Sequence, residues 1–222
     1  MDWKSLRQIG DEMVSCDESC ARISNHPSKG VLPRCLFLEE GSGSIGAVII
    51  GLNPGISSKA ERSFYIENGA TYDSTLKFWD SQVRSKVKYY TKLRGFLKQA
   101  GCEGTLLWTE LAKCENEPGF SGALPIQTYR TCAHLYLKRE LELIPKEWAV
   151  FAVGREAYNA SAYLLADRSV IGVPHPTGSR GQFANICPGG NIAKSVKDTI
   201  TEVLKSKTPM TTWLDAKDES RN

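Results

Sequence analysis

The sequence predicts an α/β fold, a single three-layer domain in which helices cover both faces of a central four-stranded parallel sheet. Its 222 residues are enough for one domain with a hydrophobic core, and no long Pro-, Gly- or Ser-rich linker divides them. Short apolar runs of strand length alternate along the chain with segments of helical periodicity. This alternation is typical of a parallel sheet covered on both faces. We expect this domain to occupy residues 1–207, followed by a polar tail over 208–222.

Four apolar runs are the expected strands of the sheet. They lie at 47–50, 105–109, 148–153 and 169–173, and a shorter candidate lies at 36–38. Helical periodicity is found at 11–23, 76–100, 125–145, 156–165 and 192–204. Ligands of such sheets bind at the carboxyl ends of the strands, so the loops that follow the strands are where we expect the functional site.

Composition limits where the protein acts. No apolar run is long enough for a signal peptide or a membrane span, so we expect an intracellular, cytoplasmic protein with no membrane partner. Seven cysteines in a reducing compartment are more often metal ligands or buried thiols than disulfides. The net charge of +3 permits a nucleic-acid partner without requiring one.

The expected helix over 76–100 is strongly basic. It has a single acidic residue, Asp80, and seven basic ones: Lys77, Arg84, Lys86, Lys88, Lys92, Arg94 and Lys98. Such a surface is suited to tracking nucleic-acid phosphates. The alternative is the solvated face of an ordinary helix, and the sequence favours neither interpretation.

Two loops at strand ends have unusual sequences. The first, Gly-Leu-Asn-Pro-Gly at 51–55, has a tight backbone that leaves the Asn53 amide at the strand tip. The second, Pro-His-Pro-Thr-Gly-Ser-Arg-Gly at 174–181, holds His175 between two prolines. The resulting loss of backbone freedom suits a group that must be aimed in advance. Each loop alone is also compatible with an ordinary turn.

Taken together and in this order, the two loops resemble the two motifs of the uracil-DNA glycosylase superfamily. The first is similar to the motif of the mismatch-specific and single-strand-selective branches, in which this Asn positions the attacking water. The second is similar to the motif in which the His hydrogen-bonds O2 of the base and the following residues enter the minor groove. Residues 150–157 also look like the strand-Gly-x-x-Ala segment of the iron–sulfur branch, so the resemblance extends from residue 16 to about residue 180.

The resemblance implies a DNA glycosylase that hydrolyses the N-glycosidic bond of a flipped-out deaminated base, uracil or a related base, in base excision repair. The DNA would be single- or double-stranded, and the protein a monomer. The implied catalytic residues are Asn53 and His175. The implied base-contacting residues are Gly51, Leu52, Glu110 and an aromatic that stacks on the base, either Phe64 or Tyr65, with stacking worth roughly 1–3 kcal/mol. The implied DNA-contacting residues are Gly178, Ser179 and Arg180.

Four cysteines resemble the ligands of the iron–sulfur branch, and they imply a 4Fe-4S cluster. That branch takes two ligands near the N-terminus, one from a Lys-Cys pair after a strand and one from the next helix, which here are Cys16, Cys20, Cys114 and Cys132. Three residues rather than the usual two separate the first pair, and Cys35 is a possible substitute for one of them. Zinc on the same thiolates and buried thiols without metal are the alternatives. We interpret the other cysteines as non-ligands: Cys35, Cys102 and Cys187.

Glu110 departs from the family pattern, because the iron–sulfur branch usually has at this position an Asn that reads the uracil edge. An ionised carboxylate only accepts hydrogen bonds, so it cannot pair with both the N3–H donor and a carbonyl of uracil. Glu110 is therefore turned out of the pocket, protonated through burial, or selective for a base with adjacent donors. We expect a pocket altered away from strict uracil specificity.

Two other functions are compatible with the sequence. A glycosylase-like protein with weak or no catalysis would bind damaged or single-stranded nucleic acid. An electron carrier would use the cluster itself, but the sequence has no second redox motif.

Overall fold

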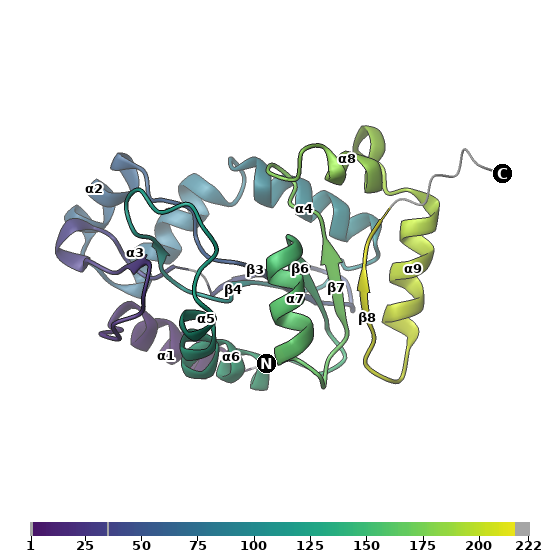
Figure 1. The fold of residues 1–222 in the computed structure, drawn as a ribbon, viewed down its shortest axis with the longest axis horizontal. Helices are drawn as coiled ribbons and strands as arrows, with labels where there is room; N and C mark the ends of the chain where they lie inside the picture. Colours follow the sequence, from purple (N-terminus) through teal and green to yellow (C-terminus); the bar gives the residue numbers. More distant parts are fainter. Residues whose placement is uncertain (1, 35, 216–222) are drawn as a thin grey trace. The chain divides into compact units, whose positions relative to one another are not determined.

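A computed structural model describes residues 2–34 and 36–215 of the protein. It has the expected mixed α/β architecture, with a mostly parallel central sheet flanked by helices (Figure 1). The strands are β1 (Ile23–Ser24), β2 (Phe37–Glu39), β3 (Ala47–Gly51), β4 (Leu106–Glu110), β5 (Glu115–Asn116), β6 (Ala149–Val153), β7 (Val170–Val173) and β8 (Thr211–Trp213). Within the described residues the main sheet has six strands rather than the expected four, in the order β2-β4-β3-β6-β7-β8, and β1 pairs with β5 in a small second sheet.

Most of the helices are short. The α-helices are α1 (Trp3–Val14), α2 (Lys59–Asn68), α3 (Tyr72–Phe78), α4 (Lys88–Gln99), α5 (Ile126–Cys132), α6 (Lys138–Glu142), α7 (Arg155–Leu164), α8 (Gln182–Ile186) and α9 (Lys194–Lys205). Two 3-10 turns, η1 (Pro27–Lys29) and η4 (Pro188–Gly190), and two π-helical turns, η2 (Trp79–Val83) and η3 (Ala133–Leu137), complete the set. Over the part of the chain that the structure describes, none of these helices has the length and apolar character of a membrane span.

The chain divides into two compact units, each assembled from three segments. Unit 1 comprises Met1–Phe37, Gly51–Val83 and Trp108–Pro145. Unit 2 comprises Leu38–Ile50, Arg84–Leu107 and Lys146–Asn222. The 51–55 loop and the four expected cluster ligands belong to unit 1, and the 174–181 loop belongs to unit 2.

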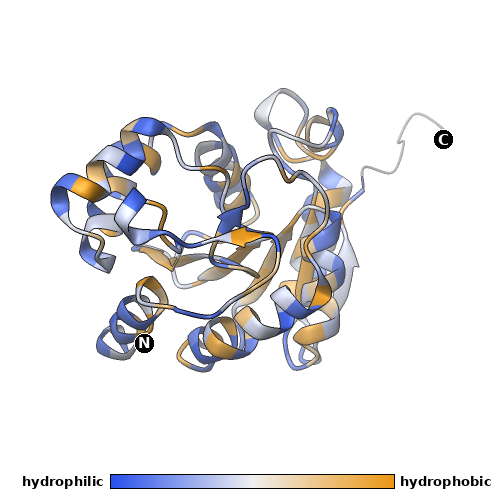
Figure 2. Ribbon diagram, turned by 60° about the vertical axis from the view of Figure 1, so that its left-hand side comes forward, coloured by the Kyte–Doolittle hydropathy of each residue, from blue (hydrophilic) through white to orange (hydrophobic). Residues whose placement is uncertain are grey.

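The core of unit 2 is a parallel arrangement of β3, β6, β7 and β8. Val48 lies opposite Val150, and Phe151 lies opposite Ile171. Every residue of β3, β6 and β7 is buried, which explains why these strands read as continuous apolar runs. Helix α7 packs on β6 and β7 (Figure 1), and the hydrophobic residues concentrate on the strands (Figure 2).

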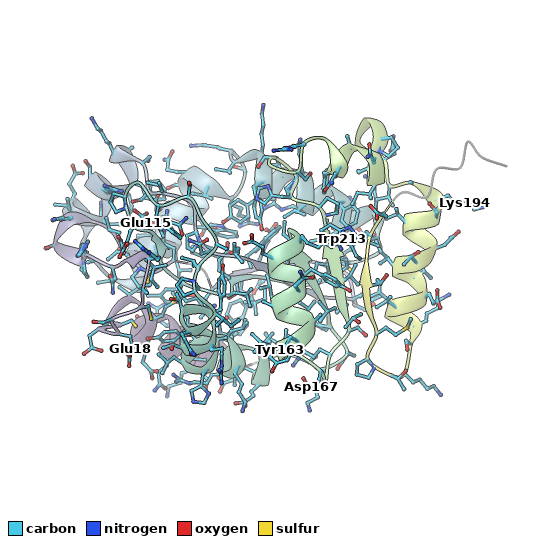
Figure 3. The ribbon with its side chains drawn as sticks, viewed as in Figure 1. Glu18, Glu115, Tyr163, Asp167, Lys194 and Trp213 are labelled. Atoms are coloured by element: carbon cyan, nitrogen blue, oxygen red, sulfur yellow. The ribbon has the colours of Figure 1, made fainter. Side chains whose placement is uncertain are left out.

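Strand β8 lies inside the segment that was expected to be a polar tail. Its three residues pair in parallel with β7, in the register Val170↔Thr211. The Trp213 ring, labelled in Figure 3, lies 3.7 Å from the Arg155 guanidinium carbon and 5.6 Å from the Tyr158 ring centroid. A Cβ on Gly172 would overlap the Trp213 ring, so glycine is needed there. A strand of three residues is too short to give a period-2 pattern in the sequence.

The expected helix over 76–100 is wrong as one continuous element. It is interrupted by the π turn η2 and by an extended residue, Val87, which precedes α4. The interruption allows Arg94 to donate to the Arg84 carbonyl, at 3.1 Å, and to form a bidentate pair with Glu39, at 2.6 and 2.9 Å. Part of the basic charge of this region therefore neutralises a buried carboxylate.

The N-terminal helix begins and ends earlier than the expected 11–23. Asp2 caps α1 by accepting hydrogen bonds from the backbone N–H groups of Lys4 and Ser5, and the helix ends at Val14. Cys16 and Cys20 consequently lie in a loop. This loop leads into β1, which pairs antiparallel with β5.

Candidate functional site

The loop over 51–57, here called the Asn53 loop, begins at the last residue of β3 and ends before α2. Its backbone is held by the chain beyond β4, because Leu111 N donates to Gly51 O and Ala112 N to Leu52 O, both at 3.0 Å. Asn53 Nδ2 donates to Asn116 Oδ1 at 2.9 Å and to Cys114 O at 3.3 Å. Since these bonds use the amide nitrogen, the half-buried side chain is oriented with Oδ1 as its acceptor end.

A buried ionic network supports the Asn53 loop. Glu115, labelled in Figure 3 and only 2% exposed, accepts hydrogen bonds from Ser57 N at 2.6 Å, Arg34 at 2.8 Å and Arg62 at 2.9 Å. Arg34 also pairs with Glu61 at 2.6 Å and donates to Gly55 O. Burial favours the neutral form of Arg34, but the neighbouring carboxylates outweigh burial and raise its pKa. Arg34 therefore stays charged, and its bonds to Gly55 O and Glu115 hold the loop.

Glu110, at the end of β4, faces the Asn53 loop. Its side chain is buried, and a Cβ built on Gly51 would overlap its carboxylate. The carboxylate therefore lies against the first residue of the loop rather than in solvent.

The two candidate stacking aromatics have different environments on α2. Tyr65 is a core residue whose hydroxyl donates to Glu61 Oε1 at 3.1 Å. Phe64 is partly exposed, with its ring centroid 5.4 Å from that of Phe78. Of this pair, only Phe64 is partly exposed. Leu52 is also partly exposed.

The loop over 174–181, here called the His175 loop, follows β7 in unit 2. Thr177 N lies 3.3 Å from Nδ1 of the half-buried His175 and donates to it. Nδ1 is therefore an acceptor, and the proton of the neutral imidazole is on Nε2. Burial lowers the His175 pKa below its usual value, so the ring is neutral at pH 7.

Contacts with α4 and α8 hold the His175 loop. Lys92 Nζ, on α4, donates to Pro176 O at 3.0 Å, and Phe183 N donates to Ser179 Oγ at 3.2 Å. Exposed Arg180 has φ +48°, a left-handed conformation that non-glycine residues rarely adopt. Gly178 is exposed beside His175.

A groove lies between the His175 loop, α4 and residues 183–190. Its volume is about 660 Å³. Residues that line it include Lys92, Phe96, His175, Arg180, Phe183 and Cys187.

The basic residues between positions 76 and 100 thus have different contacts. Arg84 and Arg94 face Glu39, and Lys92 holds the His175 loop. Lys88 and Lys98 remain exposed on α4. This region therefore does not form one continuous helix face, but its five lysines are exposed, and its suitability for binding phosphates stays a prediction.

The four cysteines expected as ligands line one cavity of unit 1. Cys16 and Cys20 come from the loop after α1, Cys114 follows β4, and Cys132 ends α5. The cavity is otherwise lined mainly by apolar residues and has a volume of about 20 Å³. That volume is enough for about one water molecule, and one wall of the cavity is the loop that carries Cys16 and Cys20. Glu18, labelled in Figure 3, marks this loop.

The cavity is rich in thiol donors. Burial raises the pKa of Cys132 to about 11 and that of Cys114 further, and neighbouring thiolates add to the Cys114 shift. Lys113 N donates to Cys132 Sγ at 3.2 Å. Four sulfur donors match the ligand chemistry of an iron–sulfur cluster. Among residues 2–34 and 36–215, no three His, Cys, Asp or Glu side chains form a group placed to hold a metal ion.

The remaining cysteines have separate locations. Cys102 and Cys187 are buried free thiols of unit 2. Cys35, the possible substitute ligand, lies outside the described residues.

Unit 1 thus brings together Gly51, Asn53 and Glu110, and separately the four cysteines. Unit 2 holds His175 with the residues that follow it. No spacing pattern in the sequence marks Arg34, Glu115 or Asn116. These residues support the Asn53 loop through loop partners 21 to 63 positions away. Comparison of the chain with protein-family models gave no match, and comparison with curated proteins gave none either.

Proposed function

We propose that this protein is a DNA glycosylase that hydrolyses the N-glycosidic bond of a flipped-out deaminated base in base excision repair. The observation that carries the proposal is the hydrogen bonding of Asn53. Its amide nitrogen is bound to Asn116 and Cys114, which leaves the amide oxygen oriented to accept a hydrogen bond from a water nucleophile.

Asn53 is a weak base, and this suits the proposed reaction. A glycosidic bond that breaks toward an oxocarbenium ion requires little activation of its nucleophile. Asn53 would position the water through Oδ1, and the departing base would take the bonding electron pair as an anion. A preorganised donor at the base oxygen lowers the energy of that anion in the transition state.

His175 is the proposed donor to the leaving base. Its Nδ1 accepts from Thr177, so the neutral ring carries its proton on Nε2 and can donate it to O2 of the base. A neutral donor at this position supports the same role that a motif of this sequence has in uracil-DNA glycosylases.

Base selection is assigned to Glu110, Gly51 and Phe64. Gly51 lets the Glu110 carboxylate approach the backbone closely, and partly exposed Phe64 is the proposed stacking residue. An ionised Glu110 only accepts hydrogen bonds, so the proposed pocket departs from strict uracil specificity, while deaminated bases as a class remain the proposed substrates. The residues proposed to enter DNA are Gly178, Ser179 and Arg180.

A 4Fe-4S cluster on Cys16, Cys20, Cys114 and Cys132 is part of the proposal. The support is that these cysteines, which come from three separate segments, line one cavity. When bound, the cluster would cross-link these segments and so stabilise the chain from β4 to β5. Cys114 O accepts a hydrogen bond from Asn53 Nδ2, so stabilising this region would also help to hold the proposed catalytic amide in place.

The proposal is tested by measuring base release from oligonucleotides that contain uracil, hypoxanthine or xanthine, in single- and double-stranded form. We expect release of at least one of these bases, and loss of most release in Asn53→Ala and His175→Ala with DNA binding retained. Asn68→Ala, which removes an exposed amide on α2, is the matched control. Specific binding of damaged DNA without release of any base would instead support the non-catalytic alternative.

A further inference from the structure

We infer that Asn116 is a positioning residue that sets the orientation of the Asn53 amide; this inference rests on the proposed function of Asn53. Asn116 is the second residue of β5, two positions after Cys114. Its Oδ1 accepts from Asn53 Nδ2 at 2.9 Å, the shortest of the three bonds that this nitrogen donates.

The orientation of Asn116 is itself fixed. Its own Nδ2 donates to Phe120 O at 3.4 Å, which directs Oδ1 toward Asn53. Phe120 is held in turn, because its N–H donates to Glu117 O at 3.0 Å, and Glu117 N donates to Arg22 O at the same distance. The amide of Asn116 is therefore an acceptor toward Asn53 and a donor toward the turn at 117–120.

The backbone of Asn116 is anchored on both sides. Asn116 pairs with Ile23 of β1, and the preceding Glu115 is bound by Arg34, Arg62 and the backbone of Ser57. A side chain on such a rigid element can restrict a neighbouring group more strictly than a loop residue can.

An amide has two ends that differ only in hydrogen-bonding character, so a free Asn53 side chain could turn by half a rotation about χ2. That rotation would present a donor to the water in place of an acceptor. The bond to Asn116 selects the productive orientation, and the weaker bond to Cys114 O acts in the same direction.

The test compares Asn116→Ala, which removes the acceptor, with Asn116→Asp, which keeps an oxygen at the same place. We expect kcat for base release to fall roughly ten- to hundredfold in Asn116→Ala with little change in KM, since misplacement of a catalytic group acts on the chemical step. Asn116→Asp should restore most of kcat. Glu117→Gln, which alters only an exposed ion pair with Arg22 at 3.8 Å, is the matched control.

A double-mutant cycle separates positioning from general destabilisation. In the Asn53→Ala background, Asn116→Ala should cause no further loss of kcat, because the group that it positions is absent. Additive losses would overturn the inference, as would a wild-type kcat in folded Asn116→Ala.

Crystal structures of the two variants give a readout that does not depend on turnover. We expect the Asn53 amide to leave its position in Asn116→Ala and to keep it in Asn116→Asp. An unmoved Asn53 in Asn116→Ala would overturn the positioning role. If the wild type releases no base, the proposed function fails, whereas movement of Asn53 in these crystals would still support the role of Asn116.

Discussion

The Glu110 carboxylate at the end of β4 lies against the α-carbon of Gly51 at the end of β3 and occupies the space that a Cβ of residue 51 would take. Any larger side chain at position 51 would displace Glu110. The glycine that opens the Asn53 loop is therefore required by a neighbouring strand and not only by the turn.

Gly51→Ala tests this contact. Overpacking at a buried site typically costs about 1–3 kcal/mol, and we expect a loss of this size in the free energy of unfolding, measured by urea denaturation. The control is Gly55→Ala in the same loop, where an added methyl would meet no atom within 4 Å. Equal stability of the two variants would contradict the contact.

Glu110→Asn tests whether Glu110 reads the base. An amide can donate and accept, as recognition of uracil requires, so this variant should release uracil faster than the wild type relative to hypoxanthine and xanthine. The measurement is the ratio of kcat/KM values on matched oligonucleotides. If the wild type releases uracil efficiently and the ratio does not change, Glu110 plays no part in base selection.

The pH dependence of stability tests the state of His175. Burial lowers the pKa of the folded state below the unfolded value of about 6.5, so neutral His175 stabilises the fold above that pH. This contribution is lost as pH falls through the folded-state pKa, because the unfolded chain takes up the proton more readily. The free energy of unfolding should therefore fall less between pH 7 and pH 5 in His175→Gln than in the wild type. An unchanged pH dependence would show that His175 titrates normally.

Anaerobic purification tests the cluster. We expect a brown protein that contains iron and absorbs at roughly 400 nm, as iron–sulfur proteins do. Cys114→Ala should lose the colour and the iron, whereas Cys102→Ala, which removes a buried thiol of unit 2, should keep both. If the folded wild type is colourless and contains stoichiometric zinc, the four cysteines form a zinc site instead of a cluster site. If it contains no metal, they are buried thiols.

The strands of the main sheet could be predicted from sequence where they are buried on both faces. The strands β3, β6 and β7 are apolar throughout, and β4 is apolar over Leu106, Leu107 and Trp108, so each could be located to within about one residue. β8 could not be found in this way, since it has three residues and depends on a ring stacked under Arg155.

Tertiary contacts explain the remaining differences. The helical period of the sequence over 76–100 continues across η2, so it does not predict a break. The bidentate bond between Arg94 and Glu39, a tertiary contact, favours one. Asn53 could be selected from its turn sequence. Its orienting partner Asn116 lies 63 positions away, and only the fold brings the two amides together.

Strand β8 also determines whether the edge of β7 is open to pairing with other molecules. It covers the outer side of β7, whose four buried residues would otherwise present unpaired amide and carbonyl groups. Exposed strand edges template intermolecular pairing, and very short terminal strands are one way in which proteins prevent it. A chain cut after residue 207 would therefore be prone to aggregate through β7, a hazard distinct from any loss of thermodynamic stability.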